Sequence, residues 1–303
     1  MSGAKMKNKT GNNVEKNLKR ATSSFVENTL PIFFPVKNIH KTKAYALFKQ
    51  NNGSLKIKTT FGALEIRGRI LGQNHKDILE MLLCQRKILI RKDDSIAVNF
   101  GRYAFLQDLG RSTGNYKWLE ERIKEIRDFN FSITYKTQDD KIMEVGGFGI
   151  IDKYKFEENG TMSVKFTEEF TNFYREENLL DYAKYVPKIA KMKEPFLKAV
   201  VREMLKHKKY QIHFSKLIEN FRYNNLLSET EIKKYKSLLK NEENRKYLAE
   251  NFNILVEKVG RDYNIKIDRD ANMVTMLINS DNFIKKQDEI VTFNQDSLFG
   301  DDL

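Results

Sequence analysis

The sequence predicts an α+β fold in which one set of elements, a helix, a strand, two helices and a β-ribbon, occurs twice in tandem. The chain has 303 residues, enough for about two ordinary domains. Apolar residues recur at spacings of three and four in several segments, and short alternating runs lie between these segments. The longest apolar runs, such as residues 30–36, are too short to cross a membrane, so we expect no membrane partner.

The first predicted domain covers residues 29–175 and opens with an extra β-hairpin. Residues 43–50, 54–61 and 63–70 are predicted strands, with an Asn-Asn-Gly turn between the first two. Asn74 is expected to cap the helix that follows. The buried face of that helix is predicted to hold Ile78, Met81, Leu82 and Leu89.

The stretch LGRSTGNYKWLEERIKEI, residues 109–126, carries the clearest helical pattern. A strand at 95–100 and a helix that ends at Gly110 precede it, and Ser112 or Thr113 is expected to cap the next helix. One face of that helix is predicted to be buried, with Tyr116, Leu119, Ile123 and Ile126.

Strands at 131–137, 141–156 and 161–166 are predicted to complete the domain with a β-ribbon. The Gly-Gly-Phe-Gly run at 146–149 lacks the Lys-Ser/Thr of a phosphate loop and lies within a strand pattern, so it predicts a bulge or bend. Helix, strand, helix, turn, helix and β-ribbon, in that order, is the arrangement of a winged helix.

The second predicted domain, residues 176–284, repeats this order. A helix follows Pro195, and Ser228 with Glu231 predicts a capping box at the start of another helix. A last helix is predicted at 243–260. Its buried face should hold Leu248, Phe252, Leu255 and Val259, and a hairpin of residues 264–270 and 272–279 should follow it.

Both ends of the chain are predicted to be disordered. Residues 1–28 form a basic, Asn- and Lys-rich arm that leads into no hydrophobic signal core. Residues 285–303 form a polar, acidic and flexible tail.

The charge indicates a polyanionic partner. Lys and Arg number 54 against 41 Asp and Glu, and the formal net charge is +13. An excess of this size is typical of proteins that bind nucleic acid. Cys84 is the single cysteine, which excludes an internal disulfide and fits a reducing cytoplasm.

The sequence offers little for catalysis, so we expect no enzyme, no catalytic residue, no metal and no cofactor. A phosphate-binding Gly-x-x-x-x-Gly-Lys-Ser/Thr motif is absent. The four histidines are scattered and form no metal-binding pair. Two Asp-Asp pairs fall at predicted turns, where Asp is common for backbone reasons.

The polar and basic residues around the predicted second helix of the helix-turn-helix are better placed for function. The N-terminal end of such a helix meets base edges in the major groove, where Arg reads guanine and Asn reads adenine. The first-domain candidates for DNA binding are Arg111, Ser112, Thr113, Asn115, Lys117, Lys124, Lys153 and Lys155. In the second domain, either Lys233, Lys234 and Lys236, or Arg245 and Lys246, face the groove, and the second set is preferred.

Three blocks, residues 68–83, 103–133 and 248–267, resemble theta-type plasmid replication initiators of the Rep and TrfA kind. The middle block is the closest match. The resemblance implies two winged-helix domains that bind double-stranded DNA at repeated origin sites (iterons), help open the origin and take part in plasmid copy control. It also implies a replicative helicase and a host initiator as partners, a homodimer, and repression of the initiator's own gene.

Two other functions compete with this interpretation. A winged-helix transcriptional regulator would have the same DNA-binding residues without a role in DNA replication. A rolling-circle nickase is disfavoured because the metal-binding histidine pair is missing.

The tail holds a further motif. Gln295, Leu298 and Phe299 resemble the Gln-x-x-Leu-Phe peptide by which bacterial replication proteins bind the sliding clamp. Asp296 departs from the commonest form of this peptide, which has Leu there.

Overall fold

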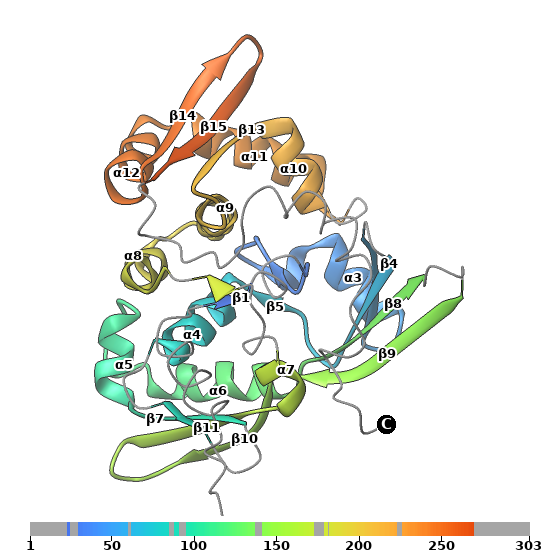
Figure 1. Ribbon diagram of the computed structural model, residues 1–303, viewed down its shortest axis with the longest axis vertical. Helices are drawn as coiled ribbons and strands as arrows, with labels where there is room; N and C mark the ends of the chain where they lie inside the picture. Colours follow the sequence, from blue (N-terminus) through green and yellow to red (C-terminus); the bar gives the residue numbers. More distant parts are fainter. Residues whose placement is uncertain are drawn as a thin grey trace, which may run out of the picture.

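The computed structural model describes residues 23–24, 30–59, 62–84, 88–90, 95–136, 141–172, 179–180, 182–222 and 226–269. The chain is a mixed α+β protein, as predicted, and within these residues its open sheets comprise two of four strands, one of three and two of two. Figure 1 shows a first unit (residues 30–172) below, a second unit (residues 195–269) above, and α8 (Val186–Lys191) beside their junction.

A helix opens the first unit where the sequence predicts a strand. In α3 (Lys43–Gln50) the hydroxyl of Thr42 accepts the amide of Tyr45 at 3.2 Å, and Ala44 and Phe48 are buried one turn apart. The strand prediction for residues 43–50 was therefore wrong, because the N-cap and the buried pair at a spacing of four favour a helix over the strand that a short apolar run before a turn suggests.

The extra hairpin consists of β3 (Ser54–Lys58) and β4 (Gly62–Arg67). It is extended by β8 (Asn130–Lys136) and β9 (Ile142–Gly149) into a sheet with the order β3-β4-β8-β9. The predicted bulge is confirmed: the register of β8 against β9 shifts opposite Gly147, which has a φ of +86°.

The central helix of the first unit, α4 (Gln73–Leu83), is buried along almost its whole length. Its N-cap is Gly72 and not Asn74, and the Nδ1 of His75 accepts the Gly72 amide at 3.0 Å. The prediction for Leu89 was also wrong, because the helix ends at Leu83 and Leu89 belongs to β6 (Ile88–Ile90).

The rest of the first unit follows the predicted order. The strand β7 (Ile96–Gly101) leads to the helices α5 (Arg102–Asp108) and α6 (Tyr116–Arg127). After β8 and β9, the hairpin of β10 (Ile151–Phe156) and β11 (Thr161–Phe166) follows. The sheet order is β10-β11-β7-β6. The predicted long strand at 141–156 is two strands, since β9 and β10 join different sheets.

The second unit has a similar order of helix, strand, helices and hairpin, but three helices follow its strand where two follow β7 in the first unit. Its elements are α9 (Pro195–Leu205), β13 (Lys209–His213), α10 (Phe214–Arg222), α11 (Glu229–Lys240), α12 (Glu242–Phe252), β14 (Ile254–Val259) and β15 (Asp262–Asp268). The capping box at Ser228 and Glu231 is confirmed. The sheet order is β13-β15-β14, so in both units the strand before the helices (β7 or β13) pairs with the second strand of the closing hairpin (β11 or β15).

The predicted helix at 243–260 was wrong in its second half. α12 ends at Phe252, because Asn253 is left-handed with a φ of +57° and the residues after it form β14. Leu255 and Val259 are exposed on this strand rather than buried on a helix. The hairpin therefore joins β14 to β15, and residues 272–279, predicted as its second strand, lie outside the described part of the chain.

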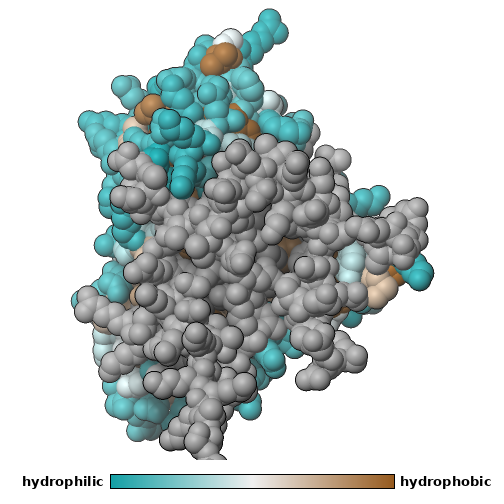
Figure 2. Space-filling view, in the orientation of Figure 1, coloured by the Kyte–Doolittle hydropathy of each residue, from teal (hydrophilic) through white to brown (hydrophobic). Residues whose placement is uncertain are grey.

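Short elements connect the units to the N-terminal segment. Ser23 and Ser24, which the sequence places in a disordered arm, form β1 and pair with β12 (Leu179–Leu180), and Ser23 is buried. The other short elements are β2 (Phe33–Phe34), β5 (Leu71–Gly72) and α7 (Glu168–Asn172). None of the described helices is long and apolar enough to span a membrane. The outer end of the second unit is largely hydrophilic (Figure 2).

Candidate nucleic-acid interface

The turn before α6 is held by backbone geometry and by packing against the junction. Gly110 follows the C-cap of α5 with a φ of +70°, and a Cβ at this position would lie 2.6 Å from Cγ of Lys191 on α8. Asn115 takes the N-cap position of α6, while the Ser112 hydroxyl accepts the amide of Gly114 at 3.4 Å. The predicted cap at Ser112 or Thr113 was therefore wrong, because both residues precede the helix within the turn.

The side chains around this turn differ in exposure. Ser112, Asn115 and Lys117 are exposed, whereas Thr113 is half-buried. The guanidinium of Arg111 stacks on Trp118, with its Cζ 3.7 Å from the ring centre. Burial lowers the pKa of Arg111, and nearby Asp77 opposes that shift. The turn thus presents hydroxyl, amide and ammonium groups to solvent, while Arg111 lies against the helix.

The outward face of α6 carries mixed charge. Lys117, Glu121 and Lys124 are exposed at spacings of four and three, so they share one face. On the inner side Leu119, Ile123 and Ile126 are buried, as predicted. This face therefore carries two ammonium groups with one carboxylate between them.

The hairpin β10–β11 packs against α6 through aromatic rings. Lys124 Nζ lies 6.0 Å from the ring centre of Phe156 on β10. Side chains alternate along a strand, so Lys153 and Lys155 project from the face of the sheet opposite Phe156. Lys155 Nζ pairs there with Glu157 at 2.7 Å. The structure does not bring these two lysines onto the same face as Lys124.

Sequence reasoning missed two residues at the start of α5. The amide of Arg102 donates to the carbonyl of Gly160 in the hairpin turn at 3.0 Å, and its guanidinium lies 4.9 Å from the ring centre of Tyr116 on α6. Tyr103 is 51% exposed beside it. These residues join the hairpin turn to the first turn of α6. The sequence pattern by which they could have been predicted is an Arg-Tyr pair directly after a strand.

In the second unit, the first turns of α11 and α12 are both acidic, and α11 carries Glu229 and Glu231 there. The first turn of α12 carries Glu242 and Glu243, and Lys246 lies 3.9 Å from Glu250. Arg245 is half-buried. The preferred second-domain pair, Arg245 and Lys246, thus follows an acidic first turn, and only Lys246 of the pair is exposed.

The α11 helix lies beside the β14–β15 turn. Lys236 Nζ donates to the carbonyl of Arg261 in that turn at 3.1 Å. Lys233 and Lys240 are exposed on the same helix, and Lys234 pairs with Glu194 at 3.5 Å. This arrangement gathers lysines and Arg261 on α11 and the neighbouring turn.

The clamp-like motif, Gln295, Leu298 and Phe299, lies outside the described residues. Within the described part of the chain, no group of three or more His, Cys, Asp and Glu side chains is placed to hold a metal ion.

No known protein family matches the sequence, and no curated protein matches it. Among solved structures, the chain is similar to a crystal structure of domains 2 and 3 of RctB, solved with selenomethionine derivatives. The sequence identity is 13%, the TM-score is 0.48, and the match covers 69% of this chain and 87% of that chain. These comparisons assign the chain to no family.

Proposed function

We propose that the protein is a replication initiator that binds repeated double-stranded DNA sites through two winged-helix units and is not an enzyme. The observation that carries the DNA-binding part is the repeated arrangement of helix, strand, helices and hairpin, in which the strand before the helices pairs with the second strand of the hairpin in both units. A winged helix places one helix in the major groove and its hairpin along the backbone. The net charge of +13 supports a polyanionic partner.

In the first unit, α6 is the groove-binding helix. Ser112, Asn115 and Lys117 are exposed at its N-terminal end, where they can reach base edges and phosphates. Lys124 contacts the flanking backbone, whereas Lys153 and Lys155 project from the other face of the β10–β11 hairpin and are not assigned to this surface. Arg111 supports the helix through Trp118 rather than reading a base, because its guanidinium is already stacked and half-buried.

In the second unit, we assign the groove to α11 rather than to Arg245 and Lys246 on α12. On α12, Arg245 is half-buried and Lys246 lies 3.9 Å from Glu250, so the first side chain is partly withdrawn from solvent and the charge of the second is partly neutralised. Lys233 and Lys240 on α11 and Arg261 in the hairpin turn present positive charge together.

The replication role rests on the resemblance of the three sequence blocks to theta-type initiators. Its partners would be the replicative helicase, the host initiator and, through the tail motif, the sliding clamp. A transcriptional regulator would share the DNA-binding surface but would need none of these partners.

The test uses the full chain, duplexes from the DNA that flanks its gene and random duplexes of equal length. Asn115→Ala is expected to weaken binding to the cognate duplex by about 1–3 kcal/mol and to reduce the preference over random DNA. Lys56→Ala, a change at an exposed lysine on β3, is the control and should bind as the wild type does. If the wild type shows no preference for any flanking duplex, the proposal is wrong.

The replication role is tested separately. A plasmid that carries the gene and its flanking repeats is expected to replicate, and Asn115→Ala should abolish replication. Repression of a promoter without plasmid replication would favour the regulator instead.

A further inference from the structure

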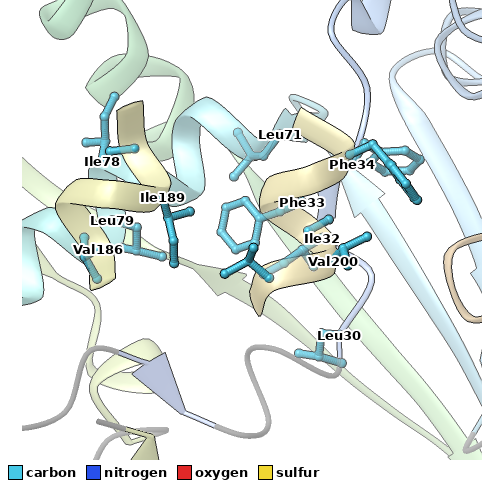
Figure 3. Close-up of a cluster of buried hydrophobic side chains, with 14 of the residues drawn as sticks. Leu30, Ile32, Phe33, Phe34, Leu71, Ile78, Leu79, Val186, Ile189 and Val200 are labelled. Atoms are coloured by element: carbon cyan, nitrogen blue, oxygen red, sulfur yellow. The ribbon is translucent and has the colours of Figure 1, made fainter. Parts of the chain in front are cut away.

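The two units meet through a continuous apolar contact. Figure 3 shows Ile78 and Leu79 of α4 facing Val186 and Ile189 of α8, and all four side chains are buried. Val200 of α9 lies in the same cluster (Figure 3). Domains that share a large apolar interface do not move freely against each other. The relative orientation of the units is therefore set at this junction.

A buried guanidinium lies within this contact. Arg202 of α9 donates from Nη1 to Gln73 at 2.7 Å, and from Nη2 to Asp77 at 2.8 Å and to Glu80 at 2.6 Å. Its Nε donates to both carboxylate oxygens of Glu80, at 2.9 and 3.0 Å. The three acceptors lie at spacings of four and three, on one face of α4. Arg202 thus joins one helix of the second unit to two turns of a helix of the first.

Neighbouring groups complete this cluster. Lys198, one turn before Arg202, donates to Asp77 and to the carbonyl of Ala190 at 2.9 Å. The hydroxyl of Tyr182 donates to Glu80 at 2.5 Å. Burial alone would raise the pKa of Glu80, but Arg202 and Lys76 outweigh it and lower that pKa, so the carboxylate stays ionised.

A buried ion cluster of this kind fixes the relative orientation of the helices more than it stabilises the fold. Desolvation offsets most of the attraction between buried charges, so replacing all partners by apolar groups is often tolerated. The guanidinium fork, however, accepts carboxylates only in a narrow range of directions. Because Arg202 is held by three side chains at once, a rotation of α9 against α4 would break several of its bonds together.

The same cluster reaches the turn before α6. Asp77, which binds Arg202 and Lys198, also acts on Arg111, whose guanidinium stacks on Trp118. On the other side of the turn, Gly110 packs against Lys191 of α8. The first DNA-binding helix is therefore attached to the residues that orient the second unit.

We propose that Arg202 is a positioning residue that sets the spacing of the two half-sites in the DNA. By holding α9 against α4, it fixes the distance and rotation between α6 and α11, so the protein accepts one spacing and rejects others. This inference rests on the proposed function, because it assumes that both units bind one duplex. Residues in direct contact with DNA would then determine which base sequence each half-site has. Arg202 would determine the distance between the two half-sites.

The test measures binding of the full chain to duplexes in which spacer base pairs are inserted between the two half-sites. An insertion of about five base pairs turns the second half-site to the opposite face of the duplex. The two units of the wild type should then be unable to bind the same duplex together. Its affinity should therefore fall by about 100-fold or more, the increase that two linked modules gain by binding jointly. The double variant Arg202→Met with Glu80→Gln removes the Arg202–Glu80 ion pair, while Asp77 keeps its contact with Lys198 and Lys76 keeps its hydrogen bond to the Ser23 hydroxyl at 3.0 Å. We expect it to bind the original spacing and to lose less than about 10-fold on insertion.

The matched control is Arg67→Met with Glu65→Gln, which removes an exposed Arg–Glu pair with an Nε–Oε1 distance of 3.0 Å on β4. It should keep the spacing profile of the wild type. If the Arg202 double variant folds and keeps that profile too, the inference is wrong. The affinity of the wild type as a function of spacer length is a second test that does not depend on whether the variant folds. If the wild type binds all spacers with equal affinity, the inference is wrong, although the proposal of DNA binding still stands. If the wild type binds no cognate duplex, the proposed function itself fails.

Discussion

Acidification should destabilise the second unit through His207, which follows α9 and stacks on Tyr210 with ring centres 4.0 Å apart. Burial, together with Lys206 and Arg269, lowers the pKa of His207 from 6.5 to about 4, against the opposing effect of Glu203. Because the pKa is lower in the folded state, the unfolded state takes up the proton first as the pH falls. The contribution of neutral His207 is thus complete above pH 6.5 and is lost as the pH falls towards about 4.

At about 1.4 kcal/mol per pKa unit, this loss amounts to about 2 kcal/mol at pH 5 and about 3 kcal/mol at pH 4. The assay is urea unfolding of the wild type and His207→Gln at about pH 7, 5 and 4. The wild type should lose about 2 kcal/mol more than the variant between about pH 7 and pH 5. His213→Gln, at an exposed position on β13, is the control and should follow the wild type. Parallel curves for the wild type and His207→Gln would refute the reasoning.

Three further predictions concern α6 and the tail. Ile123→Ala removes a fully buried side chain and should lower the free energy of unfolding by about 2–5 kcal/mol in urea, whereas Lys124→Ala should change it by less than about 0.5 kcal/mol. Lys117→Ala should reduce the slope of log affinity against log salt by about 1 if the ammonium binds a phosphate, and an unchanged slope would remove that contact. A peptide of residues 290–303 should bind a purified bacterial sliding clamp at micromolar strength, about −8 kcal/mol, and Leu298→Ala with Phe299→Ala should abolish this binding. Equal binding by the substituted peptide would contradict the motif.

The elements around α6 were predictable from the sequence because local signals agree there. Apolar residues at spacings of three and four, a Gly with positive φ before the turn, and a polar turn sequence all favour the same structure. The Gly-Gly bulge and the capping box at Ser228 were predictable for the same reason: each depends on residues that are neighbours in the chain.

The errors arose where two local patterns compete. Residues 44–48 form a short unbroken apolar run before an Asn-Asn-Gly turn, which fits a strand, yet the Thr42 cap and the burial of Ala44 and Phe48 make a helix. Leu248, Phe252, Leu255 and Val259 keep helical spacing across a strand boundary, because Asn253 breaks the helix in a left-handed conformation.

The junction could not be predicted, since it depends on contacts between distant residues. Asp77 and Glu80 look like surface charges on an amphipathic helix, and their partners Lys198 and Arg202 lie more than a hundred residues later. Only the fold brings these groups together and buries them. The half-burial of Arg111 was missed for a related reason, because it depends on Trp118 and on the junction nearby.

The measurement that tests the central claim most directly is a hydroxyl-radical footprint of the full chain on one repeat from the DNA that flanks its gene. If α6 and α11 enter successive major grooves, protection should cover two segments about one helical turn apart on one face of the duplex. Asn115→Ala should weaken protection of one segment, and Lys233→Ala that of the other. Protection of a single segment that both substitutions weaken equally would contradict the account.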